Sequence, residues 1–190
     1  MISDNTKAID RANELISRGL TDEKIIADII KNEKPIPKRL PAELYDKVNY
    51  MCRRWMDRIA RFEIEYDFIP NIRVLKTVLF CLIESAPVFH SKFIDNHINP
   101  YWKVSDYHID DIFSVRETMN LERSADDFLL QGIPVESNVQ IKIGLFFCEG
   151  KCRLCFIFNH MCMDGGGFKA FWSDFCKAYS DYALNGISPL

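Results

Sequence analysis

Two neighbouring stretches of alternating apolar residues near the C-terminal end constrain the fold more than any other feature. Residues 138–147 (NVQIKIGLFF) and 152–160 (CRLCFIFNH) place an apolar side chain at every second position. This spacing is typical of strands that turn one face towards a core. Glu149 and Gly150 lie between the two stretches and suit a tight turn. The sequence therefore predicts a β-hairpin.

A glycine-rich segment and an amphipathic helix follow this hairpin. Residues 161–167 (MCMDGGG) contain three consecutive glycines, which we expect to form a turn with positive φ into the helix. Residues 168–184 carry aromatic side chains at helical spacing. The predicted core face of this helix consists of Phe168, Phe171, Trp172, Phe175 and Tyr179.

The middle of the chain also predicts helices and strands in alternation. A helix is expected over residues 42–58, a strand over 61–68, a helix over 72–85, and one or two short strands within 101–116. In the first of these helices, the residues predicted to face inward are Leu44, Val48, Met51 and Trp55. Together with the hairpin, these elements predict an α/β (α+β) two-layer sandwich with a mixed sheet.

A helical pair is expected at the N-terminal end. Residues 6–18 place Ile9, Ala12, Leu15 and Ile16 on one helical face, and a second helix capped by Thr21 follows. The apolar face of the second helix is formed by Ile25, Ile26, Ile29 and Ile30. Residues 31–41 contain three prolines and are predicted to be a linker. We therefore divide the chain into residues 1–36 and a main lobe of residues 37–190.

Composition excludes several classes of function. The formal net charge is −3, from 24 basic and 27 acidic side chains, so nothing favours nucleic acid as a partner. The polar start is not a signal peptide, and no apolar run approaches the ~20 residues that span a bilayer. Several of the seven cysteines lie in apolar segments, which suits reduced thiols in a cytoplasmic protein.

The segment between the second predicted strand and the last helix has the residues of a catalytic site. Asn159 and His160 end the strand, Asp164 follows four residues after the histidine, and Gly165 comes next. A strand fixes the position of an imidazole, and an imidazole accepts protons near neutral pH, as a general base must. The sequence therefore favours His160 as a base.

This segment resembles the His-His-x-x-x-Asp-Gly motif of chloramphenicol acetyltransferases, condensation domains of nonribosomal peptide synthesis and alcohol acyltransferases. The resemblance extends over roughly residues 38–190, although only the motif is highly specific. It implies that His160 is the catalytic base and that Asp164 is structural and pairs with an arginine. It further implies that Gly165 keeps a substrate channel open. Asn159 replaces the first histidine of the motif, a position that is mostly structural.

The same resemblance implies a fold, a reaction and a partner. The family has two similar lobes, so this CoA-dependent acyltransferase-like chain corresponds to the N-terminal lobe. The expected reaction moves an acyl group from a thioester of CoA or carrier-protein phosphopantetheine to a hydroxyl or amine. The thioester is then a co-substrate, and no tightly bound cofactor is expected. The missing C-terminal lobe is the expected partner if the chain is truncated, and a homo-oligomer is the alternative.

Other interpretations of the sequence stay open. An amide-forming condensation domain, or a non-catalytic interaction module that kept the fold, would carry the same motif. Cys148, Cys152 and Cys155 have the spacing of an iron–sulfur site, but too few residues follow them to build the barrel of such an enzyme. Zinc binding by these cysteines with Cys162 is a further alternative, and we predict no metal site.

Charged and imidazole side chains elsewhere have less specific interpretations. The basic cluster of Lys47, Arg53, Arg54, Arg58 and Arg61 is typical of a solvated helix face, and one member is a possible partner for Asp164 or a donor phosphate. No motif surrounds the other three histidines. We expect surface or capping roles for His90, His97 and His108.

Overall fold

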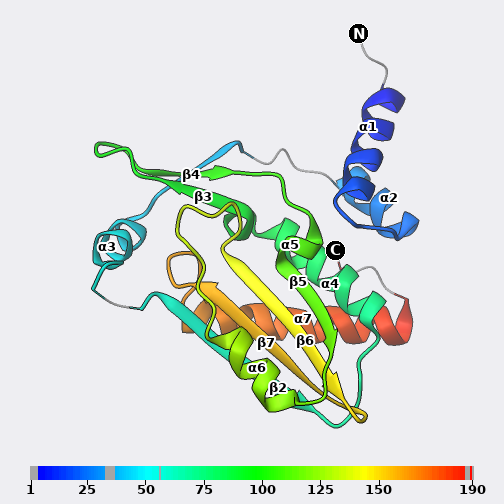
Figure 1. Ribbon diagram of the computed structural model, residues 1–190. Helices are drawn as coiled ribbons and strands as arrows, with labels where there is room; N and C mark the ends of the chain where they lie inside the picture. Colours follow the sequence, from blue (N-terminus) through cyan, green and yellow to red (C-terminus); the bar gives the residue numbers. More distant parts are fainter. Residues whose placement is uncertain (1–3, 33–36, 56, 187–188, 190) are drawn as a thin grey trace.

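The computed structural model describes residues 4–32, 37–55, 57–186 and 189 (Figure 1). Its helices are α1 (Asp4–Ser17), α2 (Glu23–Asn32), α3 (Leu44–Cys52), α4 (Ile72–Ser85), the 3-10 helix η1 (Pro87–His90), α5 (Ile109–Ile112), α6 (Leu121–Leu129) and α7 (Gly165–Asn185). Its strands are β1 (Arg39–Pro41), β2 (Ile59–Tyr66), β3 (Ser91–Ile94), β4 (Tyr101–Val104), β5 (Phe113–Glu117), β6 (Ile141–Cys148) and β7 (Lys151–Asn159).

The main sheet has the order β2-β7-β6-β5. The strands β6 and β7 form the predicted hairpin, with Leu145 opposite Leu154. The turn places Glu149 and Gly150 at φ of 49° and 83°, as a two-residue hairpin turn requires. Since β5 runs parallel to β6 and the other pairs are antiparallel, the prediction of a mixed sheet is confirmed.

Helices cover both faces of this sheet unequally. On one face, α4 and α7 pack against β6 and β7 in the largest core cluster (Figure 1). On the other face, α6 packs on a smaller cluster through Ala125 and Phe128. The predicted α/β architecture is confirmed, and α6 is an element that the apolar patterns did not identify.

A second, smaller sheet has the order β1-β4-β3. One of its faces is apolar: Leu40, Trp102 and Phe93 lie opposite one another across the three strands and pack in a separate cluster that includes Met161. The strand β1 falls within the segment predicted to be a linker, so that prediction was wrong at residues 39–41. A proline is tolerated there because β1 is an edge strand.

The N-terminal helical pair packs against the lobe. Leu15, Ile25 and Ile26 belong to the same cluster as α4 and the main sheet. Only part of the predicted face of α1 is buried, because Ile9 and Ile16 are 60% and 52% exposed. A helix that touches the lobe along one edge buries fewer residues than its periodicity indicates.

The structure corrects the predicted orientation of α3. Leu44, Val48, Met51 and Trp55 lie on the outside, and Trp55 is 81% exposed. The buried residues of this helix are Asp46 and Asn49. Periodicity identifies an apolar face but does not supply a surface for it to pack on, and α3 stands at the edge of the fold (Figure 1).

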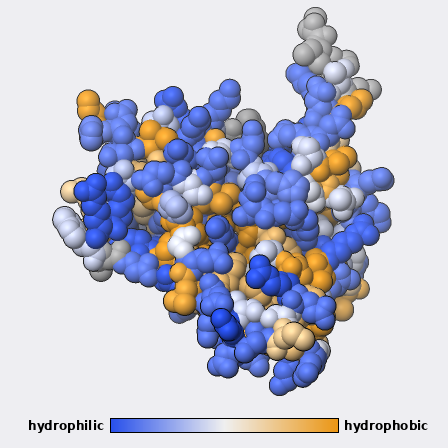
Figure 2. Space-filling model, viewed as in Figure 1, coloured by the Kyte–Doolittle hydropathy of each residue, from blue (hydrophilic) through white to orange (hydrophobic). Residues whose placement is uncertain are grey.

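The surface seen in Figure 2 is mostly hydrophilic, with hydrophobic side chains gathered towards its centre. Exposed apolar side chains are ordinary when they are scattered and informative when they form a continuous patch. Within the described ranges, no helix has the length and apolar character needed to cross a membrane.

Candidate functional site

His160 lies at the end of β7, as predicted. Asn159 is the last residue of the strand and pairs with Ile59 of β2. The backbone N–H of His160 donates to the carbonyl oxygen of Arg58 over 2.6 Å. The side chain is partly exposed and is not sealed in the interior. The sheet therefore fixes the backbone of His160, and the residue stays partly exposed to solvent.

The imidazole makes one side-chain hydrogen bond. Its Nδ1 lies 3.2 Å from the hydroxyl oxygen of Tyr45 on α3. Within the described part of the chain, the bond to Tyr45 is the one side-chain hydrogen bond of this ring, and Nε2 takes no part in it. If Nδ1 carries the proton and donates it to Tyr45, the lone pair of Nε2 is free to accept another. Sequence reasoning missed this contact, since 115 positions separate the two residues.

Polar anchors hold α3 in place beside the histidine. The indole N–H of Trp102 donates to a carboxylate oxygen of Asp46 over 3.0 Å, and the same carboxylate accepts from the N–H of Glu43. Asn49 donates to the carbonyl of Tyr45 within the helix. These bonds position Tyr45 although the opposite face of α3 is exposed.

Asn159 has the structural role that its place in the motif implies. It is 3% exposed, and its side-chain oxygen accepts from the N–H of Met161 over 3.1 Å. Its backbone N–H donates to the carbonyl of Gln140 over 2.9 Å. The amide therefore shapes the turn that presents His160.

Asp164 also shapes the backbone, but in a different way from the prediction. Its carboxylate accepts from the N–H of Gly167 over 2.7 Å and caps α7. Among the residues that the structure describes, Asp164 is exposed and forms no ion pair, so the expected arginine partner is missing. A carboxylate at a helix N-terminus is stabilised by the free N–H groups and the helix dipole.

The three glycines begin α7 and do not form a separate turn. Their φ angles are not positive, so the predicted left-handed geometry was wrong at Gly165, Gly166 and Gly167. A Cβ atom at Gly165 would meet no other atom within 4 Å. The space beside Gly165 is open, and a Cβ at Gly167 would press on Met163 at 3.0 Å.

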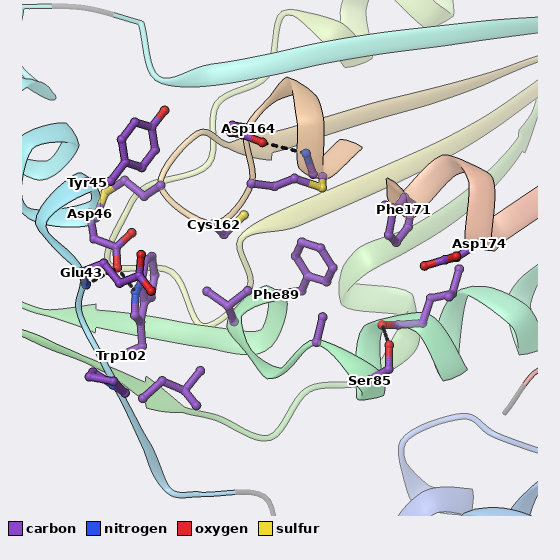
Figure 3. A pocket seen from close by; sticks show the side chains of 18 residues that line it. Glu43, Tyr45, Asp46, Ser85, Phe89, Trp102, Cys162, Asp164, Phe171 and Asp174 are labelled. Carbon is purple, nitrogen blue, oxygen red and sulfur yellow. Dashed lines mark hydrogen bonds between the residues drawn. The ribbon is translucent and has the colours of Figure 1, made fainter. Parts of the chain in front are cut away.

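A cavity of about 680 Å³ opens beside the motif (Figure 3). Tyr45 and Asp164 lie at its rim, and the apolar side chains of Phe89, Trp102 and Phe171 line it. His160 is not among the lining residues, although its neighbours Met161, Cys162 and Met163 are.

A second hollow of about 450 Å³ adjoins the beginning of the motif. Its lining includes Arg53, Arg58 and Asn159, and it shares Met161 with the first cavity. Residues on either side of His160 therefore line two hollows of ligand size, although His160 is not among the lining residues of either one.

Burial disfavours the thiolate form of three cysteines near the site. Burial raises the pKa of Cys155 to about 12, that of Cys152 to about 11, and that of Cys162 further. Cys152 and Cys155 lie in clusters on opposite faces of the sheet. Across the described residues, no group of histidine, cysteine and acidic side chains could hold a metal ion.

The other histidines differ from one another. His108 caps α5, as expected of a capping residue, and His97 is exposed. His90 is 3% exposed, so the surface role predicted for it was wrong. Its Nδ1 lies 2.8 Å from the carbonyl of Ser105, a contact that burial between α4 and β4 makes possible.

Comparison with solved structures assigns the fold. No family model and no curated protein matches the sequence. The starter condensation domain of rhizomide synthetase RzmA, solved as a point mutant in complex with C8-CoA, matches with a TM-score of 0.67 and 11% identity over 86% of this chain and 38% of that chain. The first condensation domain of the CDA synthetase matches with a TM-score of 0.65 and 14% identity over 80% and 41%. Polyketide synthase associated protein 5 from Mycobacterium tuberculosis matches with a TM-score of 0.61 and 15% identity over 82% and 36%.

These likenesses show that the chain has the fold of one part of a condensation domain. The chain spans about two fifths of each of these relatives, as expected of one lobe of a two-lobed protein. The structural similarity establishes the fold. Because the sequence identity is only 11–15%, the reaction has to be inferred from the site itself.

Proposed function

We propose that this chain is one lobe of an acyltransferase that moves an acyl group from a CoA or carrier-protein thioester to a hydroxyl or amine, with His160 as the general base. One observation supports this most. A partly exposed imidazole stands at a strand end, with one nitrogen occupied by Tyr45 and the other without a partner among the described residues, in a chain with an acyl-transfer fold.

The proposed reaction follows from the chemistry of Nε2. The lone pair of Nε2 takes the proton of the acceptor, whose oxygen or nitrogen then attacks the thioester carbonyl. The tetrahedral oxyanion collapses, the carbon–sulfur bond breaks, and the imidazolium returns its proton to the leaving thiolate. Such acid–base catalysis accelerates a reaction by about 10²–10⁴-fold.

Tyr45 is a positioning residue in this proposal. Neutral histidine has one protonated nitrogen, and base catalysis at Nε2 requires that proton to be on Nδ1. In the proposed tautomer Nδ1–H donates to the Tyr45 oxygen, and this hydrogen bond restrains the ring. The Asp46–Trp102 bond acts one step further away, because it anchors the helix that carries Tyr45.

The donor is proposed to be acyl-CoA or acyl-phosphopantetheine. Structures related in fold include one in complex with C8-CoA, which supports a CoA thioester as co-substrate here. The apolar walls of the larger cavity, formed by Phe89, Trp102 and Phe171, suit the uncharged part of a substrate. We propose no tightly bound cofactor and no metal.

A second lobe is the proposed partner. The solved relatives are more than twice as long as the matched region, so more than half of each has no counterpart in this chain. A second copy of the chain is the alternative partner. The thiols at Cys81 and Cys155, which burial keeps protonated, are compatible with the cytoplasmic location proposed from the sequence.

Two other functions have specific support. An amide-forming condensation domain is favoured by the condensation domains among the solved relatives. A non-catalytic interaction module is favoured by Asn159, which replaces a motif histidine with a buried structural amide.

An acyl-transfer assay on the full-length protein tests the proposal. Acyl-CoA donors and a panel of alcohols and amines would be followed by mass spectrometry, for the wild type and for His160→Ala. We expect at least a 10²-fold lower rate for the variant. His97→Ala is the control, because His97 is exposed and has no part in the site. Equal rates in His160→Ala and wild type would contradict the proposal that His160 is the general base.

A further inference from the structure

The second face of the small sheet carries a row of three positive charges. Arg39 on β1 lies directly opposite Lys103 on β4, and Lys103 lies directly opposite Lys92 on β3. Residues directly opposite one another in antiparallel strands share a face, so the three cations point to the same side. The apolar face of this sheet, which carries Trp102, points to the other side.

This row is not neutralised from within the described residues. Arg39, Lys92 and Lys103 form no ion pair there, and the guanidinium of Arg39 stacks on the ring of Tyr101 at 4.5 Å. Like charges directly opposite one another destabilise a sheet. The whole protein has a formal net charge of −3, so the row is a local feature and not a consequence of overall basicity.

A cavity adjoins the row. Its volume is about 520 Å³, and Lys103 and Lys38 line it together with Arg11 and Arg18 from the helical pair. The two arginines form ion pairs with Glu14 and Glu84, so the charges of these two carboxylates are balanced by the arginines. Within the described part of the chain, Lys38 and Lys103 have no carboxylate partner, and the exposed Asp106 is the one other acid in the lining.

A buried polar atom lies at the same cavity. His90 contributes to the lining, is 3% exposed, and its Nε2 has no hydrogen-bond partner among the described residues. The distance from Nε2 to the carboxylate of Glu84 is 4.0 Å, which is too long for a hydrogen bond. Buried polar atoms are seldom left without a partner, and the residue that carries this one lines the same cavity as Lys38 and Lys103.

We propose that a ligand carrying phosphate groups binds in this cavity, between the helical pair and β4. Its charge would pair with Lys38 and Lys103, and the flanking Arg39 and Lys92 would attract it. Phosphate oxygens accept several charge-assisted hydrogen bonds at once, which suits a site with converging cations. The site is separate from the proposed acyltransferase cavity, because the sheet presents Trp102 to that cavity and Lys103 to this one.

Inorganic pyrophosphate is the probe for this site. Thermal unfolding and isothermal calorimetry would be recorded for the wild type with pyrophosphate and with sodium chloride of equal ionic strength. A ligand that binds the folded state raises its stability, so we expect stabilisation by pyrophosphate beyond that by chloride. Lys103→Thr should bind pyrophosphate at least tenfold more weakly. Lys151→Thr, an exposed strand lysine in the main sheet, is the matched control and should bind like wild type.

The ligand-free variants add an independent readout. Lys103→Thr relieves two like-charge contacts and introduces a residue with high strand propensity, so its Tm without ligand should equal or exceed that of wild type. Loss of binding then cannot result from unfolding. The proposal is overturned if Lys103→Thr and wild type bind pyrophosphate equally, or if chloride stabilises as well as pyrophosphate. Binding to vesicles of phosphatidic acid without binding of pyrophosphate would also overturn it, in favour of a membrane surface.

Discussion

The helices α7 and α3 have similar apolar patterns but opposite environments. In α7, Phe168, Phe171 and Phe175 are at most 7% exposed and pack on β7 and α4. In α3, Leu44 and Met51 are 77% and 69% exposed. The difference shows that an amphipathic pattern specifies a face, whereas the neighbouring layer decides whether that face is buried.

The two helices also contribute differently to the site. The N-terminus of α7 is fixed by Asp164, and its core face holds the helix on the sheet. The helix α3 is held by the hydrogen bond from Trp102 to Asp46 and by the contact of Tyr50 with Phe93, and it presents Tyr45 to the imidazole. Three predictions test this contrast between a helix held by a broad apolar face and a helix held by a few contacts, and a fourth concerns the buried His90.

The largest effect is expected in the core of α7. Phe171→Ala should lower the free energy of unfolding by about 3–5 kcal/mol, because it removes a ring that contacts Phe89 and Phe156 and leaves a cavity. Met51→Ala in α3 should change it by less than about 0.5 kcal/mol. Urea unfolding measures both variants. A similar loss in the two would mean that α3 is buried in solution by a partner.

The next largest effect is expected at the polar anchor of α3. Trp102→Phe removes the N–H donor to Asp46 inside the protein and should cost about 1–3 kcal/mol. Trp172→Phe is the control, since Trp172 is partly exposed and makes no side-chain hydrogen bond within the described residues. Chemical unfolding of both variants compares them, and an equal cost would show that the indole contributes by packing alone.

A smaller effect is expected at the cap of α7. Asp164→Ala removes the acceptor for the Gly167 N–H and should cost about 1 kcal/mol. Asp174→Ala, on the same helix and lining the same cavity, is exposed and caps nothing, so it should have almost no effect. Thermal unfolding distinguishes them. If the two variants lose the same stability, the loss results from removing a carboxylate that lines the cavity, and the cap contributes nothing.

The smallest effect concerns pH. Burial lowers the pKa of His90, and the nearby charged groups are Glu84, Arg18 and Asp106. Near the ordinary histidine pKa of about 6.5, His90 therefore binds a proton more readily in the unfolded chain than in the folded chain. The stability of the folded state falls as the pH drops through this range. We expect a loss below about 1 kcal/mol between pH 7 and 6. His90→Gln should flatten this dependence, and an unchanged slope in urea unfolding at several pH values would assign it to other groups.

Much of the fold was predictable from local patterns. The hairpin, the long helices α4 and α7 and the helical pair all have periodicity that burial confirms at Leu154, Phe171 and Ile25. The strand β1 was missed because three residues carry too little periodicity to stand out, whereas α6 was missed although Leu121, Ala125 and Phe128 have helical spacing. The glycines of α7 were misjudged, because glycine permits positive φ without requiring it.

The site was predictable in its residues but not in its contacts. The motif placed His160, Asn159 and Asp164 in one turn. The sequence did not indicate that Tyr45 meets the imidazole, that Asp46 is anchored by Trp102, or that Asp164 caps a helix without an arginine. The contacts of Tyr45 and Asp46 depend on the packing of distant segments, which no local spacing encodes. The cap joins residues three positions apart, so an aspartate just before a predicted helix could have indicated it.

The protonation of one ring nitrogen tests the proposed base most directly. Nitrogen-15 spectra of labelled histidine, recorded where His160 is neutral, report which nitrogen carries the proton. We expect the wild type to hold the proton on Nδ1, Tyr45→Phe to shift it towards Nε2, and Tyr50→Phe on the same helix to behave like wild type. A wild-type ring with its proton on Nε2, unaffected by Tyr45→Phe, would contradict the role assigned to His160.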